Sequence, residues 1–174
     1  REKNLDPKNW KTRLSTDDVW KEKEFLSEYD LGRSGLSEDK GSIRGRVLHQ
    51  RSALSQLEVL EYSRRIYLNL ISLDLFESAD RIGLYSPIAN EVRTDSIFSH
   101  AVSGGKEVYF PKVSGSNLSF RKVSNQSELT PGSFGVLEPG SSAPEIDATE
   151  LDLVVLPGAA FDPSGSRLGY GKGF

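Results

Sequence analysis

The run Leu151-Asp152-Leu153-Val154-Val155-Leu156-Pro157 is the most apolar strand-like segment of the sequence. Its apolar residues do not alternate with polar ones, which is typical of a strand at the centre of a parallel sheet with both faces covered. Shorter strand-like runs occupy residues 81–85, 107–111 and 118–123, and residues 94–103 between the first two predict a helix. This order predicts an α/β domain, a three-layer open sandwich with a mostly parallel central sheet.

Two more helices are predicted ahead of these strands. Residues 40–51 form a basic helical stretch. A second helix is expected to begin after Ser55, because Ser55 and Glu58 have the spacing of a capping box. Apolar residues then recur every three or four positions as far as Ile71, so one face of this helix should pack on the sheet.

The length of 174 residues suits one domain with an appendage. Residues 1–38 are dense in Lys, Glu and Asp, so we expect a charged N-terminal extension of unknown role, with a short helix at 17–26, and a domain over 39–174. The net charge of -3 argues against a nucleic-acid binder. No apolar run approaches the roughly 18 residues that span a bilayer, and no leader peptide is visible, so a cytoplasmic protein is expected.

The segment that follows the most apolar strand is rich in glycine and carries two cations. In an open α/β sheet, ligands bind beyond the carboxyl ends of the strands. Glycines permit positive φ and let backbone N–H groups converge on an anion, while Arg and Lys neutralise it. The pattern therefore predicts a phosphate cradle, although a flexible surface loop explains it equally well. The residues concerned are Gly165, Arg167, Gly169, Gly171, Lys172 and Gly173.

This loop is not a Walker A motif. Ser166 occupies the position of the first glycine, and Gly173 follows Lys172 where the motif requires Ser or Thr. Phosphate recognition by this loop should therefore differ in geometry from that of a Walker A motif.

Two further candidates lie elsewhere in the sequence. Glu91 comes just after the strand at 81–85 and could bind N–H groups of a heterocycle, or else be solvated or help to cap the next helix. Lys40 and Arg44 are four residues apart, hence on one helical face, and could reach a nucleotide phosphate. A solvated basic helix end is the simpler explanation for that pair taken alone.

Residues 156–174 strongly resemble the signature of the 5-formyltetrahydrofolate cyclo-ligase (5,10-methenyltetrahydrofolate synthetase) family. Other segments agree in chain order: Lys40 to Arg44 with Arg51 and Ser55, then Tyr85 to Thr94, Gly105 to Val113 and Phe134 to Pro139. The resemblance covers roughly residues 39 to 174.

The resemblance implies ATP- and Mg²⁺-dependent conversion of 5-formyltetrahydrofolate to 5,10-methenyltetrahydrofolate, with release of ADP and phosphate. Arg167 and Lys172 would be catalytic. Implied ATP contacts are Lys40, Arg44, Arg167, Leu168, Gly169, Tyr170, Gly171, Lys172, Gly173 and Phe174. Implied substrate contacts are Ser86, Glu91, Tyr170, Gly171, Lys172, Gly173 and Phe174. The acidic Mg²⁺ ligands, and the last strands of the family's sheet, are expected beyond Phe174.

The expected partner is thus a small-molecule substrate, with no nucleic acid and no membrane, and the protein is expected to be a monomer. Two alternatives stay open. One is a folate- or nucleotide-binding protein that has lost catalysis. The other is a sugar-phosphate isomerase of similar architecture that works without ATP.

Overall fold

The structure is a computed structural model that describes residues 39–115, 117–132 and 135–170. The N-terminal extension, including the helix predicted at 17–26, lies outside the described residues, as do positions 171–174 of the glycine-rich segment. The described helices are α2 (Lys40–Ser52), α3 (Gln56–Ile71), α4 (Asp74–Ser78) and α5 (Asp95–Ser103), with 3-10 turns η2 (Gln126–Glu128) and η4 (Ala148–Glu150).

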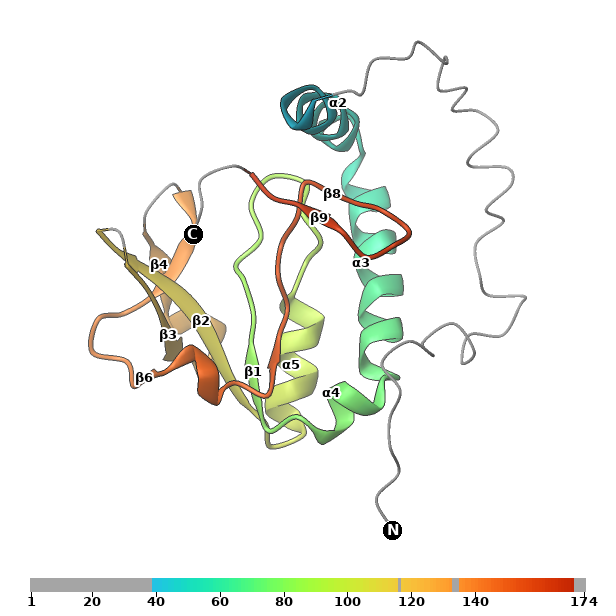
Figure 1. The fold of residues 1–174 in the computed structure, drawn as a ribbon. Coiled ribbons are helices and arrows are strands. Elements are labelled where there is room, and N and C mark those ends of the chain that lie inside the picture. Colours follow the sequence, from blue (N-terminus) through green and yellow to red (C-terminus); the bar gives the residue numbers. More distant parts are fainter. Residues whose placement is uncertain (1–38, 116, 133–134, 171–174) are drawn as a thin grey trace. The chain divides into compact units, whose positions relative to one another are not determined.

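The strands form one sheet and two hairpins. The sheet contains β1 (Arg81–Gly83), β2 (Glu107–Ser114), β3 (Asn117–Lys122), β6 (Glu145–Ile146) and β7 (Leu153–Val154). Its order is β6-β3-β2-β1-β7 (Figure 1). The hairpins pair β4 (Leu129–Pro131) with β5 (Leu137–Pro139), and β8 (Ala160–Phe161) with β9 (Arg167–Leu168).

The α/β fold class is confirmed, and the sheet is more mixed than expected. β1 pairs in parallel with β2 and with β7. β2 pairs antiparallel with β3, and β3 antiparallel with β6. The antiparallel half arises because a short turn, not a helix, joins β2 to β3, and such a turn forces the chain to reverse direction.

The segment 151–157 was expected to be the central strand, and the described residues do not show it in that place. Only Leu153–Val154 form a strand, and β7 pairs with β1 alone, so it lies at an edge of the described sheet. Leu156 is exposed. An apolar run indicates that a strand packs against something, but it does not give the strand's place in the sheet.

Side-chain caps mark the starts of two helices, and the one at Ser55 was predicted from the sequence. Asp39 accepts hydrogen bonds from the N–H groups of Gly41 and Ser42 at the start of α2. Ser55 and Glu58 form the predicted capping box of α3, which satisfies N–H groups that a helix start leaves unpaired. Thr94 precedes α5, but its hydroxyl donates to the carbonyl of Tyr85 instead of capping the helix.

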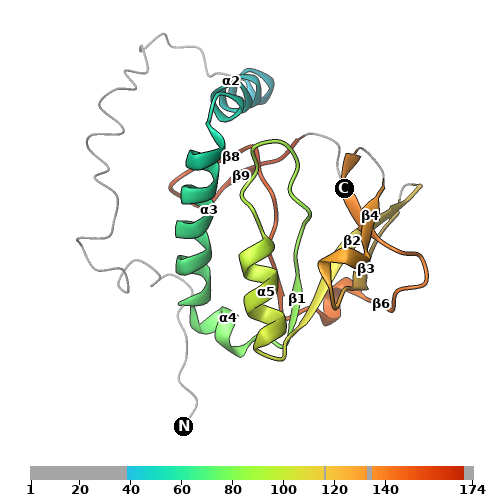
Figure 2. The same cartoon turned by 180° about the vertical axis from the view of Figure 1, so that it is seen from behind.

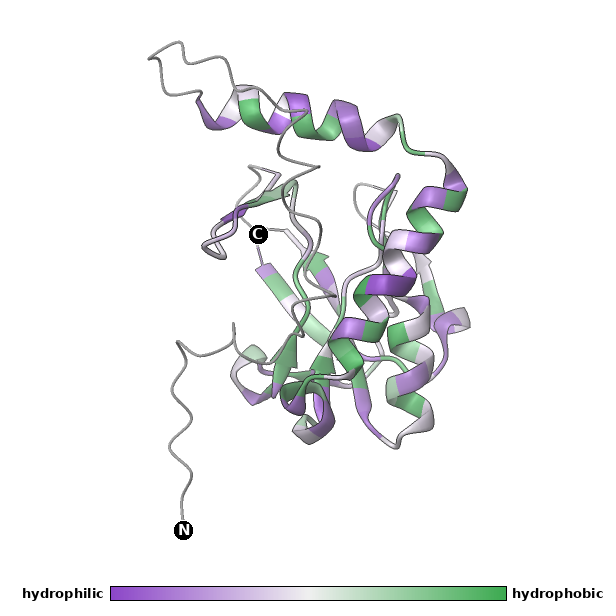
Figure 3. Cartoon of the chain, turned by 90° about the vertical axis from the view of Figure 1, so that its right-hand side faces the viewer, coloured by the Kyte–Doolittle hydropathy of each residue, from purple (hydrophilic) through white to green (hydrophobic). Residues whose placement is uncertain are grey.

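The core lies between the sheet and the helix α5. Phe76, Ile82, Ile97, Val108 and Phe110 are almost fully buried there. α5 lies behind β1 in Figure 1 and in front of it in Figure 2, so it covers one face of the sheet. Colouring by hydropathy shows mainly hydrophobic residues along the central strands, whereas hydrophilic residues are frequent on α2 (Figure 3). α2 has no fully buried residue.

Candidate active site

The loop after β1 is fastened to the end of α2 by one side chain. The amide nitrogen of Asn90 donates to the carbonyl oxygens of Arg51 (3.1 Å) and Leu54 (2.9 Å). Its amide oxygen accepts from Gln56 at 3.2 Å. These bonds tie the loop to the segment that joins α2 to α3, and they fix the position of the neighbouring Glu91.

Glu91 is a buried carboxylate, with 5% of its surface exposed. Its Oε2 accepts from the backbone N–H of Ile88 at 2.8 Å, and its Oε1 accepts from the hydroxyl of Tyr170. The turn that returns the carboxylate to Ile88 passes through Ala89, whose φ of +48° is unusual for a residue with a side chain. Such strain occurs where a loop geometry is over-determined by its surroundings, as at binding sites.

The segment predicted as an open glycine-rich loop begins as a well-defined hairpin. Ala160 pairs with Leu168 and Phe161 with Arg167. At the turn, Oδ1 of Asp162 accepts from the N–H groups of Ser164 (2.9 Å) and Ser166 (2.8 Å). Hydrogen bonds from the Ser164 hydroxyl and from Ser166 lower the pKa of Asp162 to about 2.

Glycine conformations in this segment agree only partly with the prediction. Gly165 adopts a φ of +89° at the hairpin turn, whereas Gly169 does not have a positive φ. The hairpin thus uses one glycine to reverse direction. After the hairpin, Gly169 and Tyr170 lie next to α2. The hairpin strands β8 and β9 are close to α2 in Figure 1.

Two arginines of α2 hold the chain that leaves β9. Nε of Arg44 donates to the carbonyl of Gly169 at 2.8 Å. Nη1 of Arg51 donates to the hydroxyl of Tyr170 at 2.7 Å, and its guanidinium carbon lies 5.5 Å from the centre of that ring. Arg167 instead donates to the carbonyl of Pro157 at 2.8 Å.

The phenols near Glu91 are held in their neutral form. Burial, followed by the charge of Glu91, raises the pKa of Tyr85 well above its usual value. Burial and the hydrogen bond to Glu91 raise the pKa of Tyr170 as well. Both hydroxyls are therefore protonated at neutral pH, and Tyr170 is a donor to the carboxylate.

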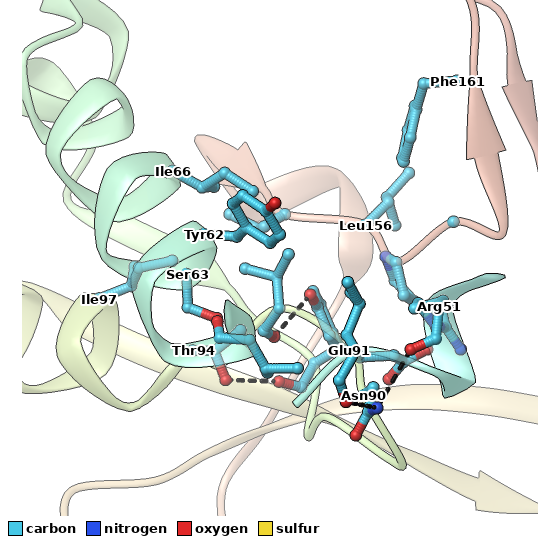
Figure 4. Close-up of a pocket in the computed structure, with 17 residues that line it drawn as sticks. Arg51, Tyr62, Ser63, Ile66, Asn90, Glu91, Thr94, Ile97, Leu156 and Phe161 are labelled. Carbon is cyan, nitrogen blue, oxygen red and sulfur yellow. Dashed lines mark hydrogen bonds between the residues drawn. The ribbon is translucent and has the colours of Figure 1, made fainter. Parts of the chain in front are cut away.

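Arg51, Tyr85, Asn90 and Glu91 line a cavity of about 260 Å³. Figure 4 shows Arg51, Asn90 and Glu91 at one side, with Tyr62 and Ile66 of α3 and Leu156 and Phe161 of the later chain forming apolar walls. A largely apolar cleft with a few fixed polar groups is the usual form of a small-molecule site. The full lining is Arg51, Leu54, Val59, Tyr62, Ser63, Ile66, Tyr85, Asn90, Glu91, Val92, Thr94, Ile97, Val155, Leu156, Pro157, Gly158 and Phe161.

Comparison with known proteins identifies the family. The sequence profile of the 5-formyltetrahydrofolate cyclo-ligase family matches residues 36–174. The chain belongs to the 5-formyltetrahydrofolate cyclo-ligase family. It is 28% identical over 149 residues to a probable 5-formyltetrahydrofolate cyclo-ligase of Caenorhabditis elegans, covering 81% of this chain and 72% of the relative. It is 27% identical over 143 residues to the mouse enzyme, covering 78% and 70%.

Solved structures of cyclo-ligases have the same fold. The 5,10-methenyltetrahydrofolate synthetase of Aquifex aeolicus matches with a TM-score of 0.70 and 36% identity, over 77% of this chain and 68% of that one. The synthetase of Mycoplasma pneumoniae matches with a TM-score of 0.62 and 25% identity, over 79% and 74%. The family, the enzyme class and the α/β fold predicted from the sequence are thereby confirmed.

The structure brings several of the residues predicted for a cyclo-ligase site together. Arg44 contacts Gly169, and Tyr170 contacts Glu91. Leu168 pairs with Ala160 in the hairpin, one residue from Gly169. Gly171, Lys172, Gly173 and Phe174 lie outside the described residues.

Other predicted residues have different surroundings. Lys40 is exposed in the first turn of α2 and does not line the cavity. Ser86 is buried and also does not line it, and its hydroxyl has no hydrogen-bond partner among the described residues. Arg167 faces Pro157, so the described structure shows it supporting the hairpin.

Sequence reasoning did not assign a role to Arg51 or to the apolar walls. Arg51 is seven residues after Arg44, hence on the same helical face, and this spacing was a usable signal. Nothing in the sequence pairs Tyr62 of α3 with Phe161 of β8 across one cavity.

No helix of the described residues is long and apolar enough to cross a membrane.

Proposed function

We propose that this chain catalyses the ATP-dependent closure of 5-formyltetrahydrofolate to 5,10-methenyltetrahydrofolate, with release of ADP and phosphate. The observation that carries the proposal is that Arg51 of α2 and Glu91 line one cavity, and that Tyr170, from a distant segment, is hydrogen-bonded to both of them. The names of the family and of the relatives agree with this activity.

In this proposal, Glu91 binds the N–H groups of the reduced pterin. Ile88 and Tyr170 each supply one donor to the carboxylate, and an ionised carboxylate can accept about four hydrogen bonds. Its capacity for further donors and its burial suit recognition of a heterocycle. The apolar walls, including Tyr62 and Phe161, suit the flat rings of a folate.

The cations near the hairpin would bind the triphosphate. The bond from Arg44 to Gly169 uses one of five guanidinium N–H donors, so this side chain fits a further role toward phosphate oxygens. Lys40 lies one helical turn before Arg44 and can approach the same group. Arg167 and Lys172 complete the set that we propose for transition-state charge.

The chemistry has two steps. The formyl oxygen of the substrate attacks the γ-phosphorus of ATP, the bond from that phosphorus to the ADP oxygen breaks, and ADP leaves. N10 then attacks the activated formyl carbon and loses its proton, while the carbon–oxygen bond breaks and inorganic phosphate departs. Phosphoryl transfer needs positioning and charge neutralisation and no side-chain nucleophile.

Mg²⁺ is expected to accompany ATP. Within residues 39–115, 117–132 and 135–170, no group of three or more His, Asp or Glu side chains could hold a metal ion. Neither step above relies on a metal ion held by the described residues.

The test is the absorbance of 5,10-methenyltetrahydrofolate when the protein, ATP, Mg²⁺ and 5-formyltetrahydrofolate are mixed. An ATP-dependent rise supports the proposal, and its absence from a folded protein overturns it. A binding protein without catalysis would bind 5-formyltetrahydrofolate in calorimetry and release no ADP. The predicted monomer and cytoplasmic location are tested separately, by sedimentation and by imaging of a tagged protein in cells.

A further inference from the structure

Arg51 joins three parts of the candidate site. Its guanidinium contacts Tyr170 through a hydrogen bond and through the face of the ring, and its backbone carbonyl accepts from Asn90. It also lines the cavity. Arg51 is thus linked both to the loop that carries Glu91 and to the segment that leaves β9.

The hydroxyl of Tyr170 lies between a cation and an anion. A phenol has one proton, so a hydroxyl that donates to Glu91 must receive the Arg51 N–H as an acceptor. The bond from Arg51 therefore selects the direction in which the Tyr170 proton points. Asymmetric chains of this kind strengthen each bond and hold all three groups in one arrangement.

Arg51 acts on Glu91 through Tyr170 and not directly. Among the described side chains, the structure has no ion pair between Arg51 and Glu91 within 4.0 Å. The opposing effects on the phenol agree with this arrangement, because Glu91 raises the pKa of Tyr170 and Arg51 lowers it.

We propose that Arg51 is a positioning residue: it holds the Tyr170 hydroxyl on Glu91 and so fixes the orientation in which Glu91 binds the reduced pterin. This inference rests on the proposed function. The ring contact restrains the aromatic plane, the hydrogen bond restrains the hydroxyl, and Ile88 restrains the second carboxylate oxygen. A carboxylate held at both oxygens presents its remaining lone pairs in a fixed direction, which lowers the ordering cost of substrate binding.

The decisive experiment is a double-mutant cycle with Arg51→Gln and Tyr170→Phe. It measures the dissociation constant of 5-formyltetrahydrofolate by calorimetry, together with KM and kcat. We expect Arg51→Gln to weaken substrate binding about tenfold in the wild-type background and less than about twofold beside Tyr170→Phe. The KM for ATP should change little. Arg51→Lys, which keeps the charge and one donor, should recover part of the loss.

Several outcomes would overturn the inference. An equal loss in both backgrounds would mean that Arg51 binds the substrate itself or acts only on stability. No loss in either background would remove its role. The exposed Arg64→Gln on α3 is the matched control for removing a surface guanidinium. If Arg51→Gln does not fold, the same cycle is run with Arg51→Lys.

A second readout needs no ligand and separates this inference from the proposed function. The ionisation of Tyr170 is followed by ultraviolet difference titration against Tyr170→Phe. Because Arg51 favours the phenolate, Arg51→Gln should move the ionisation to higher pH. An unchanged titration sinks the inference. If Arg51→Gln does shift the Tyr170 titration but the wild-type chain does not bind 5-formyltetrahydrofolate, the inference about Arg51 stands and the proposed function is wrong.

Discussion

The hydroxyl of Tyr170 donates a hydrogen bond to Oε1 of Glu91, 79 positions earlier in the chain. Tyr170 follows the β8–β9 hairpin, and Glu91 lies in the loop after β1. One bond therefore connects the segment proposed for phosphate with the carboxylate proposed for the pterin. A ligand at either end can influence the other through this pair, because any displacement of Tyr170 removes a donor from Glu91.

Tyr170→Phe should weaken binding of 5-formyltetrahydrofolate. The substitution leaves Oε1 of the buried Glu91 without its donor and Arg51 without its acceptor, and loss of a hydrogen bond to a charged group costs about 1.5–3 kcal/mol. This corresponds to a rise of roughly ten- to a hundredfold in KM for the folate. Tyr67→Phe, which removes a hydroxyl bonded to His100 outside the cavity, is the control. Equal KM values in the two variants would contradict the prediction.

Glu91→Gln should reduce kcat/KM about a hundredfold or more. The amide has nearly the same shape, so the fold is retained, but it lacks the charge and half of the acceptor capacity that the pterin N–H groups require. The measurement is the rate of methenyltetrahydrofolate formation at low substrate. Glu61→Gln on the exposed side of α3 makes the same chemical change away from the cavity. Retention of full activity by Glu91→Gln would remove Glu91 from the substrate site.

Lys172→Ala should lower kcat by about 10²–10³, since loss of one preorganised charge on a transferring phosphoryl group typically has this effect. The KM for 5-formyltetrahydrofolate should change less than kcat. Lys40→Ala serves as a comparison: that lysine is exposed at the start of α2, and its loss should raise the KM for ATP more than it lowers kcat. Near-normal turnover of Lys172→Ala would contradict the proposed role in transition-state charge.

Local signals predicted the local structure well. The capping box of Ser55 and Glu58 follows from short-range hydrogen bonds that the sequence encodes directly. The place of β7 at an edge of the described sheet does not follow from such signals. It depends on which strands pair, and the apolar run at 151–157 is compatible with several answers.

The candidate site could be predicted where a family motif marks it and not where it is built from packing. The motif indicated Glu91 and Tyr170, which the structure places in contact. Tyr62 and Phe161 line one cavity although they are distant in the sequence, and a hairpin turn at Asp162 follows Phe161. The serines around Asp162 were the signal for that turn, since Asp and Ser side chains commonly bond to backbone N–H groups two residues on.

Asn90→Ala should destabilise the domain by about 1–3 kcal/mol, because it removes the hydrogen bonds that Asn90 donates to the carbonyls of Arg51 and Leu54 and so detaches the loop from this part of the chain. The loss appears as a lower midpoint of urea unfolding with an unchanged slope. Asn69→Ala on the exposed surface of α3 is the matched control and should leave the midpoint nearly unchanged. Equal midpoints for the two variants would show that Asn90 does not anchor the loop.

Asp162 should give the hairpin a stability that depends on pH in the acid range. Its folded pKa of about 2 is below the usual value of 3.8, so the ionised form is favoured in the folded state. The contribution is therefore present above pH 3.8 and is lost as the pH falls through about 2. Asp162→Ala should have a lower melting temperature than wild type at pH 6, and the gap should narrow as the pH falls toward 2. The exposed Asp80→Ala provides the comparison for removal of a carboxylate. A gap that stays constant from pH 6 to pH 2 would mean that the Asp162 carboxylate does not hold the turn through its charge.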